Sequence, residues 1–205
     1  YDMNVFLNGS CGDISTRFSR QGADEKEVLR YGRMFEEKLL EMRKRASVVT
    51  IEDLRCVHAV KTLDLKKADS VEHAQKELDA CKQRLEEARA NGVTGSDLRL
   101  IESYKEGADA NLRFAKCAFS MKSYDVNIMF IKINQHIIVC VPGELFSELS
   151  NPLQNEHVHF IGYANGYMGY FADEAAYDNF CYEALSSPFQ KGQSEMMMAF
   201  IAQEI

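Results

Sequence analysis

Four short segments of the chain carry residue types that can do chemistry. In the first segment, glycines flank small polar residues after an apolar run, which is typical of a tight loop whose N–H groups and hydroxyls face a ligand. We take Asn8 and Asp13 from this loop as candidate substrate-binding residues. Taken alone, the pattern is also typical of a plain turn. The four segments are Asn8-Gly9-Ser10-Cys11-Gly12-Asp13-Ile14-Ser15, Val141-Pro142-Gly143-Glu144, Asn165-Gly166-Tyr167-Met168-Gly169-Tyr170 and Tyr182-Glu183.

The other three segments contribute two carboxylates, Glu144 and Glu183, and several phenols. A Pro-Gly pair stops an apolar run just before Glu144, so this carboxylate is expected at a strand end, where ligand-binding groups gather in sheet proteins. A glutamate at an ordinary turn is the alternative. Tyrosines as dense as Tyr167 and Tyr170 are unusual in a solvent loop. For Tyr167 and Tyr177 the pattern favours aromatic packing with satisfied hydroxyls.

Together the four segments resemble, in order and in motif, the neutral/alkaline non-lysosomal ceramidases. The resemblance is to the later portion of that family's N-terminal catalytic domain. It runs from about Val5 to the end of the chain and is strongest after Asn127. It implies that Ser15 is the active-site serine and that Tyr182 is the catalytic tyrosine stabilising the reacting carbonyl oxygen. It also implies two zinc ligands, which are Glu144 and Tyr170.

The resemblance also implies that the metal site is incomplete in this chain. The family's other two zinc ligands are histidines upstream of the serine, so we expect residues 1–205 to be one domain, the C-terminal half of a ceramidase-like catalytic domain whose upstream half is absent. We expect this fragment alone to be inactive, and we count the missing N-terminal half among its partners. Zinc with an open position polarises an amide carbonyl and acidifies a bound water, which is chemistry that suits amide hydrolysis.

Five histidines remain in the chain, and none stands in a family ligand motif. Two of them, His157 and His159, could place imidazoles on one strand face as a metal pair. The loop after the serine departs from the family, because Thr16-Arg17 replaces Pro-Asn. The stretch after Glu183 departs as well, so we name the substrate only as an N-acyl lipid or related amide.

These inferences predict a zinc-dependent amidohydrolase of lipid or sphingolipid metabolism, acting on a carbon–nitrogen amide bond of a small-molecule or lipid substrate. The alternative is a non-catalytic ceramidase-like domain that binds a ligand or partner. A helical interaction module built on residues 69–116 is a third reading, resting on amphipathicity alone. The resemblance implies a secreted, periplasmic or otherwise extracytoplasmic location.

Composition excludes several other classes of protein. The 205 residues are 46% hydrophobic and carry a net charge of −7, which disfavours disorder and a nucleic-acid-binding surface. No apolar run approaches the roughly 18 residues of a transmembrane helix, so none is expected. The six cysteines have no zinc-ribbon spacing, and they leave both disulfides and buried free thiols open.

Hydrophobic periodicity predicts an α/β or mixed α+β fold, a mixed sheet flanked by helices that include a long helical hairpin. The turn at Asn134-Gln135 predicts a β-hairpin, and the three methionines at 196–198 are expected in the core. Strands are expected over 5–7, 48–51, 56–63, 126–133, 137–141 and 158–164, and helices over 24–45, 69–92, 94–112, 174–186 and 192–204.

Overall fold

The computed structural model describes residues 5–16, 19–117 and 121–205 of the chain. Its contacts divide the chain into two compact units. The sheet unit comprises Tyr1–Ile14 and Asp53–Ile205, and the α1 unit comprises Ser15–Glu52. Each unit is described by itself, and the expectation of one domain over residues 1–205 stays a prediction.

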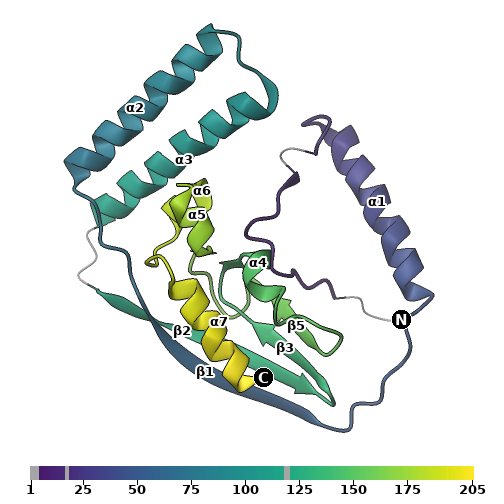
Figure 1. The fold of residues 1–205 in the computed structure, drawn as a ribbon. Helices are drawn as coiled ribbons and strands as arrows, with labels where there is room; N and C mark the ends of the chain where they lie inside the picture. The colour runs from purple at the N-terminus through teal and green to yellow at the C-terminus, as the bar shows by residue number, and fades with distance from the viewer. Residues whose placement is uncertain (1–4, 17–18, 118–120) are drawn as a thin grey trace. The chain divides into compact units, whose positions relative to one another are not determined.

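The sheet unit is built on a mixed four-stranded sheet in the order β1-β2-β3-β5 (Figure 1). The first two neighbouring pairs are antiparallel, and β3 pairs with β5 in parallel. Asn134 forms the predicted hairpin turn between β2 and β3 with a φ of 51°, a left-handed conformation that asparagine tolerates. The strands are β1 (Leu54–Asp64), β2 (Ser123–Ile133), β3 (His136–Cys140) and β5 (Val158–Ile161).

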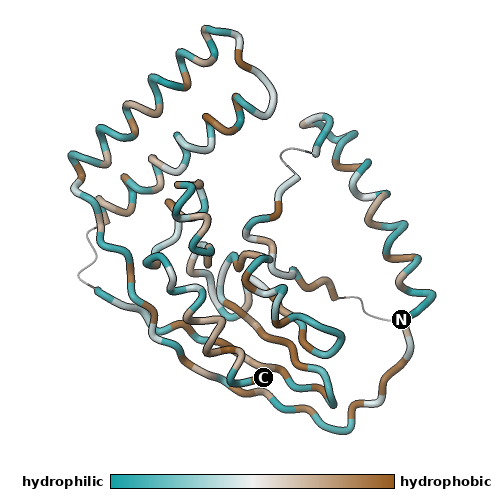
Figure 2. The backbone as a smooth tube through the Cα atoms, in the orientation of Figure 1, coloured by the Kyte–Doolittle hydropathy of each residue, from teal (hydrophilic) through white to brown (hydrophobic). Residues whose placement is uncertain are grey.

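Alternating residues of β2 form the centre of the hydrophobic core. Val126, Ile128 and Phe130 are at most 1% exposed, and they pack with Met197 and Ile201 of α7 (Gln193–Glu204). In Figure 2 the hydrophobic residues of this unit concentrate along the sheet strands. Two of the three consecutive methionines are buried as predicted, whereas Met196 is 49% exposed because it lies on the outer side of the helix.

The predicted helical hairpin is confirmed as α2 (Val71–Ala90) and α3 (Gly95–Cys117). Its seam is made of small and aliphatic residues, so the two helices approach closely. The N-cap of α2 is Ser70, whose side chain accepts the N–H of His73. The buried residues of the seam are Ala74, Leu78, Ala108, Leu112 and Ala115.

Helix α3 also packs against the short helix α6 (Tyr182–Ser186). The contact is made at Gly107, where an added Cβ would lie 2.7 Å from Leu185 Cδ1 and 3.4 Å from Tyr182 Cα. A Cβ here requires the Leu185 side chain to move, and a larger side chain would also press against the backbone of Tyr182. This contact fixes the element that carries one of the predicted catalytic residues.

A second, two-stranded sheet and two further short helices complete the sheet unit. The single helix expected over 174–186 is split into two, since Phe180 adopts a φ of 50° that no α-helix can continue through. The expected strand over 158–164 ends at Ile161 for a similar reason, because Tyr163 has a φ of 57°. The remaining elements are β4 (Glu144–Leu145), α4 (Ser147–Ser150), β6 (Tyr170–Phe171) and α5 (Glu174–Asp178).

Two predicted strands are wrong. Residues 5–7 and 48–51 are extended chain without a strand partner among the described residues, and Val5 and Val48 are 70% and 85% exposed. High β-propensity reports only that a segment fits a pleated surface, and it forms a strand only where another strand pairs with it. The helix predicted for the α1 unit is confirmed as α1 (Glu25–Arg43), capped by the Asp24 side chain.

All six cysteines are free thiols, of which Cys140 is buried. Over the described part of the chain, no helix has the length and apolar character needed to cross a membrane.

Candidate functional site

The pairing of β4 with β6 positions the predicted metal ligands. Both strands are two residues long and run parallel, with Glu144 opposite Tyr170. The Glu144 N–H donates to the Gly169 carbonyl oxygen over 2.9 Å, and the Phe146 N–H donates to the Phe171 carbonyl oxygen over 3.1 Å. Two residues far apart in sequence are thus neighbours in the fold.

Two glycines make this close pairing possible. A Cβ on Gly143 would lie 2.4 Å from the Gly169 carbonyl oxygen, and a Cβ on Gly12 would lie 2.5 Å from the carbonyl oxygen of Glu144. Backbone therefore passes against backbone on both sides of Glu144, where only glycine fits. This is the structural use of the Pro-Gly-Glu motif and of the glycine-rich loop.

Tyr182, the first residue of α6, joins the same site. Its ring meets the Tyr170 ring edge-on, with 5.8 Å between the ring centroids and 78° between the planes. Ser187, directly after α6, donates its hydroxyl hydrogen bond to the Tyr170 carbonyl oxygen over 2.8 Å and is fully buried. The structure therefore brings together three of the residues predicted from the sequence, namely Glu144, Tyr170 and Tyr182.

Two further tyrosines complete what we call the Glu144 cluster, defined as Glu144, Tyr163, Tyr167, Tyr170 and Tyr182. The Tyr167 hydroxyl donates to Glu144 Oε1 over 2.5 Å. The Tyr163 and Tyr167 rings are stacked, with centroids 5.9 Å apart and planes 10° apart. The hydroxyl of Tyr167 is satisfied as predicted, but its acceptor is the candidate zinc ligand. Sequence reasoning missed Tyr163, because nothing in its local pattern marks it.

Three phenols around Glu144, those of Tyr163, Tyr167 and Tyr170, are held in the neutral form by raised pKa values. Partial burial, followed by the hydrogen bond to Glu144, raises the pKa of Tyr167 to about 12. Burial and then the charge of Glu144 also raise the pKa of Tyr170 well above its ordinary value. The pKa of Tyr163 is raised by burial and by its hydrogen bond to Glu144. The negative charge of Glu144 thus disfavours ionisation of these three tyrosines.

The Asp13 side chain makes hydrogen bonds within the protein. Its two carboxylate oxygens accept the backbone N–H and the hydroxyl of Ser147 at the start of α4, each over 2.7 Å. Asn8 donates its side-chain amide to Cys11 Sγ over 3.2 Å, and its carbonyl oxygen accepts the N–H of Gly162. The loop is therefore anchored beside the Glu144 cluster, and its role in substrate binding stays a prediction.

Ser15 is the first residue of the α1 unit, and its predicted catalytic role stays a prediction. Of the substituted pair that follows it, Arg17 lies outside the described residues. Tyr177 is structural as expected, because its hydroxyl donates to the Phe189 carbonyl oxygen over 2.8 Å.

The donors of the Glu144 cluster fit part of a zinc site. Carboxylate and phenol oxygens are oxygen ligands of a kind that suits zinc, and a cation between them would offset the repulsion that raises the pKa of Tyr170. In the described ranges, no three His, Cys, Asp or Glu side chains are grouped so as to hold a metal ion. Glu144 and Tyr170 would therefore supply two ligands of such a site, and further ligands would have to come from elsewhere.

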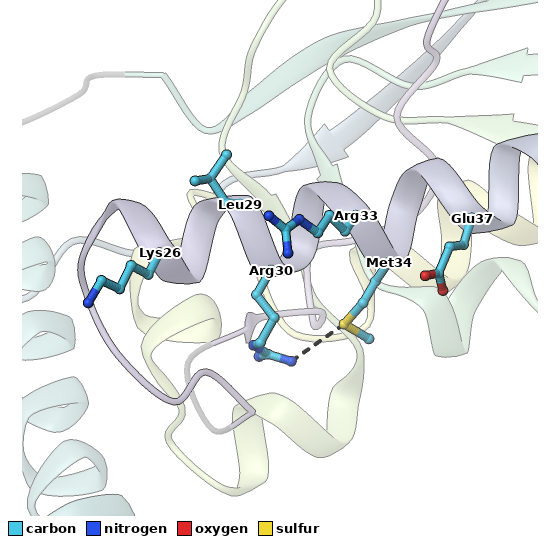
Figure 3. A pocket seen from close by; sticks show the side chains of 6 residues that line it. All are labelled: Lys26, Leu29, Arg30, Arg33, Met34 and Glu37. Atoms are coloured by element: carbon cyan, nitrogen blue, oxygen red, sulfur yellow. Dashed lines mark hydrogen bonds between the residues drawn. The ribbon is translucent and has the colours of Figure 1, made fainter.

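A hollow of about 390 Å³ lies along α1 in the other unit (Figure 3). Its walls are side chains of this one helix, and the Arg30 guanidinium donates to Met34 Sδ over 3.4 Å. None of the predicted site residues lines it, so it is not the candidate site. The lining residues are Lys26, Leu29, Arg30, Arg33, Met34 and Glu37.

The raised pKa of Tyr167 gives a testable pH dependence. Because the folded-state pKa of about 12 exceeds the ordinary value of about 10, the resulting stabilisation is fully present below pH 10 and is lost as pH rises through 12. NMR titration of isotopically labelled tyrosine should show this late transition, assigned by its absence in Tyr167→Phe. Glu144→Gln should move it part of the way back, since the contribution of burial remains. An unchanged Tyr167 transition in Glu144→Gln would contradict the assigned hydrogen bond.

Comparison with known proteins gives a limited similarity. The sequence matches no protein-family model and no curated protein. Among solved structures, the chain is similar to the neutral ceramidase from Pseudomonas aeruginosa, with a TM-score of 0.32 and 22% identity. The match covers 37% of this chain and 14% of that chain.

Proposed function

We propose that this chain is part of a zinc-dependent hydrolase that cleaves the amide bond of an N-acyl lipid or related substrate. The observation that carries the proposal is the convergence of Glu144, Tyr170 and Tyr182 from three separate elements. Each of these residues stands in a separate sequence motif. The first and last of them are 38 positions apart in the sequence. Chance is therefore a poor explanation for their proximity in the fold.

Each residue of the cluster has a distinct proposed role. Glu144 and Tyr170 hold the zinc, together with two histidines contributed from outside this chain. Bound zinc supplies a Lewis acid for the amide carbonyl and a more acidic water. The Tyr182 hydroxyl donates a hydrogen bond to the carbonyl oxygen as negative charge develops there. Ser15 is the proposed active-site serine, and Asn8 and Asp13 belong to the loop proposed to contact substrate.

The dense tyrosines have a supporting role in this proposal. Tyr167 fixes the Glu144 carboxylate through its 2.5 Å hydrogen bond, so one carboxylate oxygen is oriented before any ligand arrives. Preorganised ligands lose less conformational entropy when an ion binds. The neighbouring stacked ring of Tyr163 limits the positions that Tyr167 can take.

The proposal is tested by elemental analysis of the full-length gene product. All variants carry His159→Gln, which removes the possible His157–His159 metal pair. In this background we expect zinc near one equivalent per chain, lost in Glu144→Ala and retained in Glu148→Ala, a control at an exposed glutamate on α4. Tyr182→Phe should keep the zinc and lower kcat on an N-acyl lipid about 100-fold, the cost of removing one donor to a developing oxyanion. Zinc that persists in Glu144→Ala would contradict the ligand assignment.

A second candidate function is a ceramidase-like domain that binds a ligand or partner without catalysis. It is favoured by the hydrogen bond from Tyr167, which already occupies one oxygen of the predicted zinc ligand. The same experiment separates the two candidates, because a full-length protein that holds no zinc would rule out the metal-dependent hydrolase and support the binding domain.

A further inference from the structure

Three histidines lie on one face of the sheet where β3 and β5 begin. His136 is the first residue of β3, His157 directly precedes β5, and His159 is the second residue of β5. Ile137 pairs with Val158 in parallel register, and the Ile137 N–H donates to the His157 carbonyl oxygen over 2.7 Å. Because side chains alternate along a strand, the three imidazoles fall on the same face.

The ring positions confirm this grouping. The His136 ring centroid lies 5.3 Å from that of His157, in an edge-on arrangement at 70°. It lies 5.9 Å from the centroid of His159, with the planes 21° apart. Since each Zn–N bond is about 2.0–2.1 Å long, two imidazoles on one tetrahedral ion have ring centres roughly 5–6 Å apart. The spacing of these rings is therefore that of ligands sharing one ion.

One ring nitrogen of this group has no hydrogen bond to lose when an ion binds. His157 Nδ1 is buried and has no hydrogen-bond partner among the described residues, which is costly for a polar atom. Its other ring nitrogen, Nε2, is 3.5 Å from Glu156 Oε1. By contrast, the exposed His73 on α2 has Nδ1 held by Asp69 over 2.6 Å. Binding an ion would give His157 Nδ1 the polar partner that it lacks.

The donor nitrogens have not yet converged on one point, in keeping with the lack of a preformed metal-holding group among the described side chains. The rings are already adjacent and His159 is exposed, so the inferred site requires rotation about side-chain torsions to bring the donor nitrogens together. The backbone, which sets the spacing of the three Cα atoms, is fixed by the parallel β3–β5 ladder.

We infer that His136, His157 and His159 form a binding site for a divalent transition-metal ion that prefers imidazole, such as zinc, copper or nickel. Neutral imidazole suits these ions, whereas magnesium and calcium prefer oxygen ligands. The neighbouring Glu156 carboxylate is placed to approach the His157 ring and to serve as an additional ligand or a hydrogen-bond acceptor. This site is at the opposite end of β5 from Tyr163, so it is separate from the Glu144 cluster.

Calorimetric titration of the protein with Zn²⁺ and with Ni²⁺ tests this inference. We expect one equivalent bound at this site in the Glu144→Ala variant, which lacks the other proposed zinc ligand. In that background, His159→Gln should weaken binding by at least the roughly 10–100-fold that loss of an outer-shell partner costs. NMR should show the imidazole signals of His136, His157 and His159 shifting together on addition of Zn²⁺.

The control is His73→Gln, which removes an exposed imidazole on the helical hairpin and should leave the affinity unchanged. His159 is exposed, so its replacement should leave the fold intact, and circular dichroism verifies this. The inference is overturned if Glu144→Ala binds no ion, or if His159→Gln and His157→Gln bind as tightly as the Glu144→Ala parent. Failure here leaves the proposed hydrolase untouched, because that proposal is read from zinc lost in Glu144→Ala.

Discussion

Replacing Gly143 with alanine is expected to lower the free energy of unfolding by about 3 kcal/mol, the upper part of the range for overpacked substitutions. The added Cβ would lie 2.4 Å from the Gly169 carbonyl oxygen and 2.8 Å from Phe171 Cε2. The first of these atoms is backbone in the strand partner, so the strain cannot be relieved by rotating a side chain. Urea unfolding monitored by circular dichroism measures the loss.

Gly9→Ala is the matched control, because the nearest atom to its new Cβ would be 3.9 Å away. Its unfolding free energy should stay within about 0.5 kcal/mol of the parent, as for most substitutions that make no new contact. The same pair of variants also tests the site. In Gly143→Ala the late titration of Tyr167 should shift, since Glu144 moves with the β4 backbone. Equal unfolding midpoints for the two variants would show that β4 and β6 are not packed as closely as described.

Phe171→Ala is expected to cost about 3–5 kcal/mol, the range for truncating a buried aromatic side chain. Phe171 is fully buried, and its ring stacks on that of Phe189 with centroids 5.0 Å apart. Truncation leaves a cavity in the main core at β6, the strand that also carries Tyr170. The loss of unfolding free energy should therefore be accompanied by loss of the ordered Glu144 cluster.

The control for this second substitution is Phe180→Ala. Phe180 is 68% exposed, so truncation removes little buried surface and should change the unfolding free energy by no more than about 0.5 kcal/mol. A Phe171→Ala variant as stable as Phe180→Ala would mean that β6 does not belong to the main core.

The core of the sheet could be predicted from the sequence because its signal is local. The alternation of Val126, Ile128 and Phe130 specifies a strand with one buried face, and the structure buries all three. The extended run at Val5 has equal β-propensity and stays exposed. Strand formation depends on a partner, and the identity of a partner is not encoded within a short segment.

The candidate site could be predicted in part. Glu144, Tyr170 and Tyr182 were found because each stands in a motif, and their meeting is a result of the β4–β6 pairing and the α3–α6 contact. Tyr163 was missed because it reaches the cluster through a left-handed turn, which no pattern of side-chain types predicts. The Asp13 carboxylate accepts hydrogen bonds at the start of α4, a structural use that its loop pattern did not predict, and its contact with substrate stays a prediction.

The contact at Gly107 sets how freely different parts of the helical hairpin can vary. Among the described residues, the buried face of α2 packs against α3, so substitutions on its solvent-facing side should accumulate without effect on the site. Position 107 has no such freedom, because any side chain there meets Leu185 and a larger one would also press against the backbone of Tyr182. We therefore expect substitutions to be tolerated on the solvent-facing side of α2 and to be harmful at position 107 of α3. Saturation mutagenesis of α2 and α3 would measure this difference.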